Sequence, residues 1–134
     1  MDKEYNEDFF ANEPSGLSYK IIGAAIEVHK ALGPGLLESA YENCLAQELN
    51  EKGLKFGRQV PLPVFYKGRS IDCSYCLDFL VENSIILELK SVEKVLHVHV
   101  AQLLTYLRLA KIKIGFLLNF NVPCLKDGIY RRVL

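Results

Sequence analysis

The sequence predicts one domain of the α/β or α+β class, built around a mixed β-sheet. Three observations support this prediction. Two amphipathic helical segments come first, extended segments follow, and a third helical segment then precedes a nearly continuous apolar run. The chain has 134 residues, and half of them are hydrophobic, which is enough to form the buried core of an ordinary domain.

The first part of the domain is predicted to hold two helices. Ser18 is the predicted N-cap of the first helix. The apolar residues of this helix recur at spacings of three and four: Ile21, Ile22, Ala25, Val28 and Leu32. A Gly-Pro-Gly run at 33–35 ends the helix, because glycine suits the left-handed residue after a helix and proline cannot continue one. A second helix is predicted over residues 36–52, and Gly53 ends it.

Extended segments dominate the rest of the chain. Pro61 and Pro63 lie two residues apart, so both missing N–H groups fall on one side of the strand, which predicts an edge strand. The Lys67-Gly68 pair predicts a turn. Alternation and apolar runs predict four further strands, at residues 69–81, 85–90, 112–119 and 129–134. A third helix is predicted over residues 97–109.

The distribution of charge limits the possible functions. Sixteen Lys and Arg balance sixteen Asp and Glu, which argues against a protein that coats nucleic acid through many phosphate contacts. A small, local nucleic-acid site stays compatible with this balance. Residues 1–16 are acidic and are predicted to form a flexible N-terminal leader. Residues 17–134 are predicted to form a single domain.

The sequence also suggests a cellular setting. No run of about 18 apolar residues occurs, and the N-terminus is polar, so neither a membrane span nor an export signal is expected. The four cysteines are too few and too irregularly spaced for a disulfide framework. We therefore expect a reduced, cytoplasmic protein.

The hairpin around Asn83 brings two acidic residues opposite each other. Its predicted pairs are Val81–Ile85, Phe79–Leu87 and Asp78–Glu88. Directly opposed residues have Cβ atoms only about 5 Å apart, so the carboxylates of Asp78 and Glu88 would repel each other. A divalent cation between them would replace this repulsion with coordination, and oxygen ligands suit Mg²⁺ or Mn²⁺. Lys90 lies on the same strand face, where it could hold a phosphate or orient a water.

A solvated polar sheet face, with Lys90 neutralising one of the acids, is the alternative interpretation. Against it, Glu88 and Lys90 lie in an otherwise apolar strand over residues 85–90, which indicates partial burial. Buried charges are costly unless they are paired or bound to a metal.

The same residues carry a resemblance to a known family. The acid-x9-Glu-x-Lys spacing over residues 78–90 resembles the active-site signature of the PD-(D/E)xK nuclease superfamily. Residues 35–41, Gly-Leu-Leu-Glu-Ser-Ala-Tyr, resemble the motif that names the GxxExxY family within that superfamily. Segments 101–107 and 119–123 extend the resemblance, which runs from about Leu17 to Asp127.

The resemblance implies a central sheet flanked by helices, with a metal site at the split between the central strands. It also implies a role for each matching residue. Asp78 and Glu88 would be the metal-binding and catalytic acids, and Lys90 would be the catalytic lysine. Glu38 would be an additional acid that serves both metal binding and catalysis.

Three residues of the third predicted helix are further candidates. Gln102 matches a catalytic glutamine that follows the Glu-x-Lys strand in the family. Tyr106 lies four residues beyond Gln102 and is expected to have a supporting role, because residues four apart on a helix project together. Packing against the sheet is the alternative for both residues. His99 falls in the same segment as a second supporting residue, with a helix-surface or capping role as its alternative.

Cys73 and Cys76 are relevant to phosphate binding and to a possible zinc site. Cys76 stands where members of the family often carry a basic residue, and this difference is expected to weaken phosphate binding. Cys73 and Cys76 form a CxxC pair, but an odd offset on a strand points two side chains to opposite faces. A zinc site is therefore not expected.

Two functional hypotheses follow. The first is a Mg²⁺- or Mn²⁺-dependent nuclease that hydrolyses DNA or RNA with a metal-activated water. The second is a nuclease-like module that binds without catalysis, in a homodimer or with a protein partner in a larger complex. Small size and zero net charge motivate the second.

Overall fold

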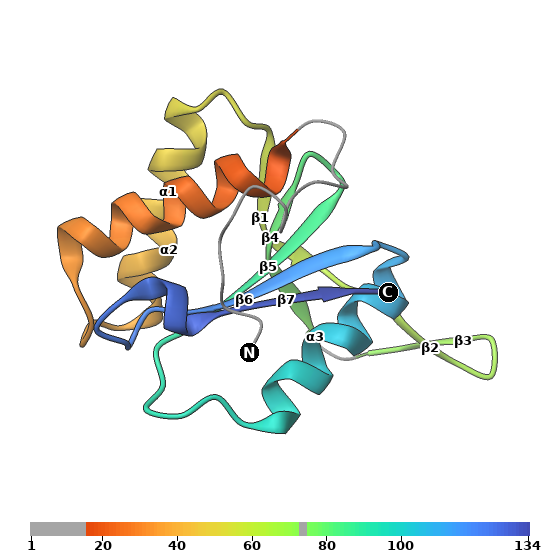
Figure 1. Ribbon diagram of the computed structural model, residues 1–134. Coiled ribbons are helices and arrows are strands. Elements are labelled where there is room, and N and C mark those ends of the chain that lie inside the picture. The colour runs from red at the N-terminus through yellow and green to blue at the C-terminus, as the bar shows by residue number, and fades with distance from the viewer. Residues whose placement is uncertain (1–15, 73–74) are drawn as a thin grey trace.

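The computed structural model describes residues 16–72 and 75–134 (Figure 1). The predicted leader therefore lies outside the described residues, except for its last position, and so does Cys73 of the CxxC pair. The helices and strands in chain order are α1 (Leu17–Leu32), α2 (Glu38–Glu51), β1 (Phe56–Pro61), β2 (Val64–Tyr66), β3 (Arg69–Ile71), β4 (Cys76–Val81), β5 (Ile85–Lys90), α3 (His97–Ala110), β6 (Ile114–Asn119), a short 3-10 helix (Leu125–Gly128) and β7 (Ile129–Val133).

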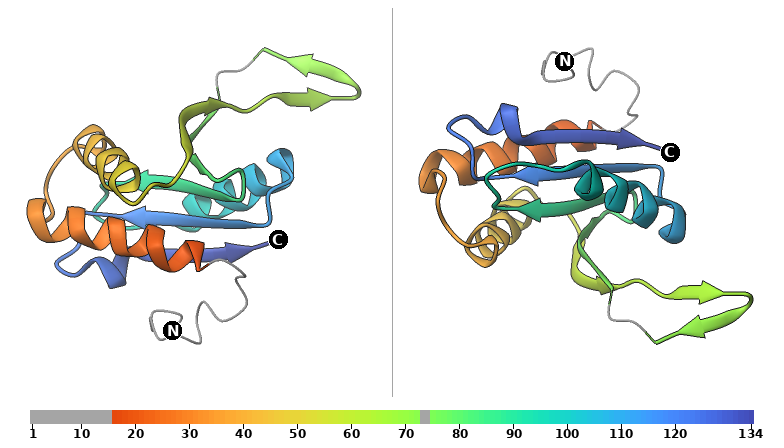
Figure 2. Two further views of the ribbon diagram at one scale, coloured as in Figure 1. Left: turned by 90° about the horizontal axis from the view of Figure 1, so that it is seen from above. Right: turned by 90° about the horizontal axis from the view of Figure 1, so that it is seen from below.

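Five strands form the main sheet in the order β1-β4-β5-β6-β7. β5 and β6 run parallel because α3 connects them as a crossover, and the other neighbouring strands are antiparallel. α1 and α2 cover one face of this sheet and α3 covers the other (Figure 1, Figure 2). The predicted fold class, a mixed sheet flanked by helices, is confirmed.

β5 is the central strand of the sheet and is buried on both faces. Its odd-numbered residues Ile85, Leu87 and Leu89 pack in the core beneath α1 and α2. Ile86 packs in the smaller core beneath α3. Because side chains alternate along a strand, Glu88 shares the α3 face with Ile86.

Helix α1 ends where the sequence predicts, but its N-cap is a different residue. Ser18 is not the N-cap: Gly16 occupies that position with a left-handed backbone (φ 62°), and Ser18 is buried in the first turn. Serine capping requires an extended backbone, whereas the chain enters α1 in a conformation that favours glycine. The other end is as predicted, because Leu32 is the last helical residue and Gly33 follows it with φ 67°.

The strand predicted over residues 69–81 is wrong as a single strand, because it is divided into β3 and β4. Regular alternation over residues 69–81 also predicts Leu77 and Phe79 on one face, because residues two apart on a strand point the same way. Leu77 instead packs beneath α3, and Phe79 packs beneath α1 and α2. The regular alternation fails at Asp78, where Gln59 of the adjacent strand has a positive φ of 48° and the β1–β4 ladder is interrupted.

The segment that links α1 to α2 is held in place by Tyr41. This side chain is fully buried; its hydroxyl donates to the carbonyl of Gly33 (2.7 Å) and accepts the N–H of Leu36 (3.1 Å). Its ring stacks on Phe120 with centroids 4.5 Å apart. Gly35 has φ 97°, which L side chains rarely adopt. The first and last residues of the Gly-x-x-Glu-x-x-Tyr motif thus shape the chain just before Glu38.

β1 is an edge strand of the main sheet, as predicted, but only Pro61 belongs to it, because Pro63 lies between β1 and β2. No helix in the described part of the chain is long and apolar enough to span a bilayer.

Candidate active site

Asp78 of β4 and Glu88 of β5 meet where the ladder between their strands ends. The pairs Val81–Ile85 and Phe79–Leu87 form as predicted. Asp78 and Glu88 do not form the next ladder pair. Glu88 Oε2 accepts the backbone N–H of Asp78 (2.9 Å), and Asp78 Oδ2 accepts the backbone N–H of Leu89 (2.8 Å). The carboxylates therefore take up two backbone N–H groups at the point where the strands separate.

Burial makes the charged forms of Asp78 and Glu88 unfavourable. Only 5% of Glu88 is exposed to solvent, and Asp78 is half-buried. Burial, together with the neighbouring negative charge of Asp78, raises the pKa of Glu88 to about 8. Burial also raises the pKa of Asp78, although hydrogen bonds from Leu89 and Gln59 oppose the shift. Without a cation, the site therefore favours a protonated Glu88 at neutral pH.

The pKa of Glu88 predicts how stability changes with pH in metal-free protein. The folded state holds one more proton than the unfolded state between the ordinary glutamate pKa of 4.5 and about 8. The stability that this proton gives to the folded state is fully present below this window and is lost as pH rises through it. Within the window the free energy of unfolding falls by roughly 1.4 kcal/mol per pH unit. Glu88→Gln removes the titration and keeps an acceptor for the Asp78 N–H.

Urea unfolding with EDTA, at several pH values across this window, checks the prediction. The free energy of unfolding of the native protein should fall relative to that of Glu88→Gln as pH rises. Parallel pH profiles for the two proteins would show that Glu88 titrates normally.

Lys90 and Glu38 lie close enough to this pair to affect it. The positive charge of half-buried Lys90 lowers the pKa of Glu88, whereas the negative charge of exposed Glu38 raises it. Glu38 is the first residue of α2. The Ser91 hydroxyl donates to the carbonyl of Leu36 (2.6 Å), which ties the segment before α2 to the end of β5. This hydrogen bond brings Glu38 toward the same end of the sheet as Lys90.

The chain after Lys90 is held by Asn119, a residue whose role the sequence reasoning missed. Asn119 is 3% exposed and is the register partner of Lys90 on β6. Its Oδ1 accepts the N–H of Val92 (3.0 Å), and its Nδ2 donates to the Val92 carbonyl (3.0 Å). An asparagine within a buried strand is the available sequence signal, because its amide must find partners there.

Gln59 is a second missed residue. Its Nε2 donates to Asp78 Oδ1 (3.3 Å) and to Glu42 Oε1 (2.7 Å), so it bridges β4 and α2. Glu42 is in turn paired with Arg58 (2.8 Å). No local pattern marks Gln59, because its contact with Asp78 depends on a positive φ in β1. These residues orient Asp78 from the side of α2.

Two of the three candidates on α3 line one hollow. Gln102 and Tyr106, with Tyr75 and Val64, contribute to the walls of a cavity of about 350 Å³. Burial, and then the charge of Glu88, raises the pKa of Tyr106, which places this tyrosine in the electrostatic field of the acids. His99 has a different position: its Nδ1 accepts the N–H of Leu96 (3.0 Å). The alternative of a capping role is therefore the one that the structure shows for His99.

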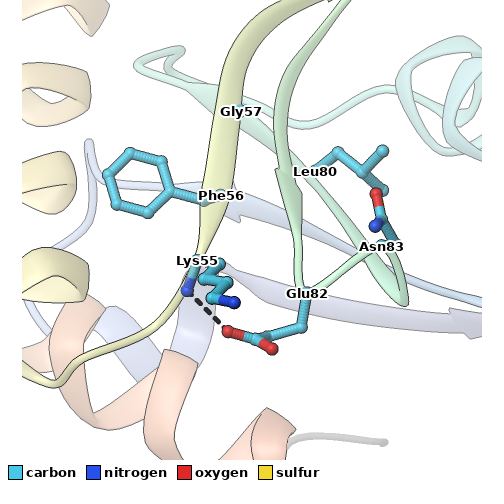
Figure 3. Close-up of a pocket in the computed structure, with 6 residues that line it drawn as sticks. All are labelled: Lys55, Phe56, Gly57, Leu80, Glu82 and Asn83. Carbon is cyan, nitrogen blue, oxygen red and sulfur yellow. Dashed lines mark hydrogen bonds between the residues drawn. The ribbon is translucent and has the colours of Figure 1, made fainter.

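Another hollow lies at the other end of β1 and β4 (Figure 3). Its volume is about 430 Å³, and its walls include Lys55, Phe56 and Glu82. The backbone N–H of Lys55 donates to the Glu82 carboxylate across it. None of the predicted site residues is among those lining it, so this hollow is separate from the acid pair.

The chemistry of the acid pair fits a divalent cation. Both groups offer oxygen ligands, and each has an elevated pKa because no positive charge compensates its burial fully. Mg²⁺ is often bound by only one or two carboxylates, with waters and substrate phosphates completing its shell. Within residues 16–72 and 75–134, no group of three His, Cys, Asp or Glu side chains is close enough to hold a metal, so Glu38 does not join the pair directly.

The fold and the acid-acid-lysine arrangement define a class of nuclease-like proteins, and comparison with known families agrees. A model described as the PD-(D/E)XK nuclease superfamily matches residues 15–133. The chain belongs to this superfamily. A search of curated proteins and a search of solved structures each found no significant match.

Proposed function

We propose that this protein is a divalent-metal-dependent nuclease that hydrolyses phosphodiester bonds in DNA or RNA, and that it belongs to the GxxExxY family of its superfamily. One observation carries the proposal most strongly. The carboxylates of buried Glu88 and half-buried Asp78 accept backbone N–H groups from neighbouring strands at the end of a ladder, and both have raised pKa values. A fold that needed only stability would avoid this arrangement, because each uncompensated charge opposes folding.

In this proposal Asp78 and Glu88 hold Mg²⁺ or Mn²⁺, and Glu38 supports them as an additional acid. The bound cation would lower the pKa of a water and stabilise charge on the phosphate. Asp78 is oriented by the N–H of Leu89 and the amide of Gln59, so its position is set before substrate arrives. The hydrogen bond from the Asp78 N–H orients Glu88 in the same way.

Lys90 supplies the positive charge of the site. Its ammonium group would contact the scissile phosphate and favour the extra negative charge that develops there. Gln102 and Tyr106 line the adjoining hollow and would position the phosphate or the attacking water. His99 would act only indirectly, by holding the start of α3. The proposal places the reaction in a reducing cytoplasm, in keeping with the free thiols of Cys44, Cys76 and Cys124.

Calorimetric titration with Mn²⁺ tests the metal site directly. The native protein should bind Mn²⁺, and Asp78→Asn and Glu88→Gln should each lose this binding with unchanged circular dichroism. Glu93→Gln is the matched control, because Glu93 is an exposed acid just beyond β5. A native protein that neither binds Mn²⁺ nor cleaves any nucleic acid would contradict the proposal and favour the binding module.

A further inference from the structure

Strands β2 and β3 form an arm that projects from the body of the protein (Figure 2). The arm comprises residues 64–71, and its strands form a separate two-stranded sheet. The turn at its tip is built by Lys67 and Gly68, which have φ values of 50° and 78°. Every residue from 65 to 71 is exposed. A two-stranded hairpin alone is only marginally stable in water, and in the described part of the chain β2 and β3 pair only with each other.

The tip of the arm combines aromatic rings with positive charges. Phe65 is 64% exposed and Tyr66 is 63% exposed. Lys67 places its Nζ 5.4 Å from the centre of the Tyr66 ring, and Arg69 is the register partner of Tyr66. Asp72, just beyond β3, is the nearest acid along the chain. Exposed rings beside cations match the chemistry of a nucleic-acid strand, which offers base faces for stacking and phosphates for ion pairing.

The base of the arm leads into the candidate active site. The N–H of Leu62 donates to the carbonyl of Tyr75 (2.8 Å), which closes the arm at its base. The Tyr75 ring lies 6.1 Å from that of Tyr106. Val64 of β2 lines the same hollow as Tyr75, Tyr106 and Gln102. An apolar surface thus connects the arm with Tyr106, the tyrosine that lies in the electrostatic field of Glu88.

We infer that the arm is a clamp for single-stranded nucleic acid. Phe65 and Tyr66 are neighbours on β2 and present their rings on opposite faces of the hairpin, so unpaired bases stack on both faces while Lys67 and Arg69 contact phosphates. This inference rests on the proposed function and narrows its substrate class to nucleic acid with an unpaired stretch beside the scissile bond. Paired bases in a duplex are already stacked on each other, so their faces are not accessible to the rings. The arm therefore favours single strands over blunt duplexes.

Fluorescence anisotropy in EDTA tests the clamp separately from catalysis. The probes are a single strand of about 20 nucleotides, longer than common binding sites, as DNA and as RNA, and a blunt duplex of equal length. Phe65→Ala combined with Tyr66→Ala should weaken single-strand binding by roughly tenfold or more. Tyr19→Ala is the control, because Tyr19 is an equally exposed aromatic residue on α1. It should bind as the native protein does.

The charged residues provide a second, independent readout. Lys67→Gln combined with Arg69→Gln should reduce the slope of log affinity against log salt by about 1.4, since each phosphate contact contributes about 0.7 for single strands. Circular dichroism verifies that each variant is folded. A double aromatic variant that binds the single strand as tightly as the native protein overturns the clamp.

Two further outcomes would also overturn it. One is equal binding of the single strand and the duplex. The other is a native dimer in sedimentation velocity that the aromatic variant converts to a monomer, which would assign the arm to a second copy of the chain. Neither outcome affects the proposed nuclease, because Mn²⁺ binding at Asp78 and Glu88 and cleavage of other substrates are measured separately.

Discussion

Replacing Glu88 with Gln or Lys90 with Ala is expected to reduce nucleic-acid cleavage by roughly 100-fold or more while the protein stays folded. Gln keeps an oxygen acceptor for the Asp78 N–H but loses the negative charge that a cation requires. Ala at position 90 removes the ammonium group and leaves the backbone bond from Phe120 N–H to the Lys90 carbonyl intact. Neither change therefore removes a backbone interaction that supports β5.

Cleavage of labelled DNA and RNA with Mn²⁺ or Mg²⁺ measures this effect, and thermal unfolding verifies the fold. Lys94→Ala is the matched control for Lys90→Ala, because Lys94 is an exposed lysine in the segment that follows β5. It should cleave at nearly the native rate. Retained activity in both purified Glu88→Gln and Lys90→Ala would refute the assignment of the active site.

The same variants separate the two hypotheses about function. A nuclease loses turnover in Glu88→Gln, whereas a binding module never cleaves and keeps its partners when Asp78 is replaced. The pH dependence of stability does not discriminate between them, because the buried acid pair exists in either case.

Gly128→Ala is expected to destabilise the fold strongly. A Cβ at this position would lie 2.1 Å from the backbone oxygen of Asn119, a distance that real Cβ contacts essentially never show. The obstacle is backbone rather than a flexible side chain, so either the 3-10 helix or the end of β6 must move. Overpacking of this kind typically costs about 1–3 kcal/mol and occasionally more. The shift would also disturb Asn119, whose amide holds Val92.

Urea unfolding measures the change, with Gly23→Ala as the control. Gly23 lies within α1, and a Cβ there would meet only Lys52 Nζ, at 4.0 Å. Because alanine is the better helix former by about 1 kcal/mol, Gly23→Ala should be neutral or stabilising. If Gly128→Ala unfolds at the native urea midpoint, the close approach to Asn119 is not a constraint on the fold.

The sequence by itself determined the features that depend on local periodicity and turn chemistry. The apolar spacing and the Gly-Pro-Gly run marked α1 and its end, and the apolar run after the turn at Asn83 marked β5. The register of the β4–β5 hairpin also followed from its short turn, because a slip by one residue would move every side chain to the other face of the sheet. These signals involve neighbours along the chain, so they can be read without the rest of the fold.

The tertiary structure alone decided how the site is assembled. The bonds from Gln59 to Asp78 and from Asn119 to Val92 join residues that are distant in the sequence, and no periodicity encodes them. The change of face between Leu77 and Phe79 arises from an irregular β1–β4 ladder, which a pattern of alternating residues cannot report. The physical reason is that burial and charge depend on which elements pack together. That packing also raises the pKa of Glu88 and leaves the arm exposed.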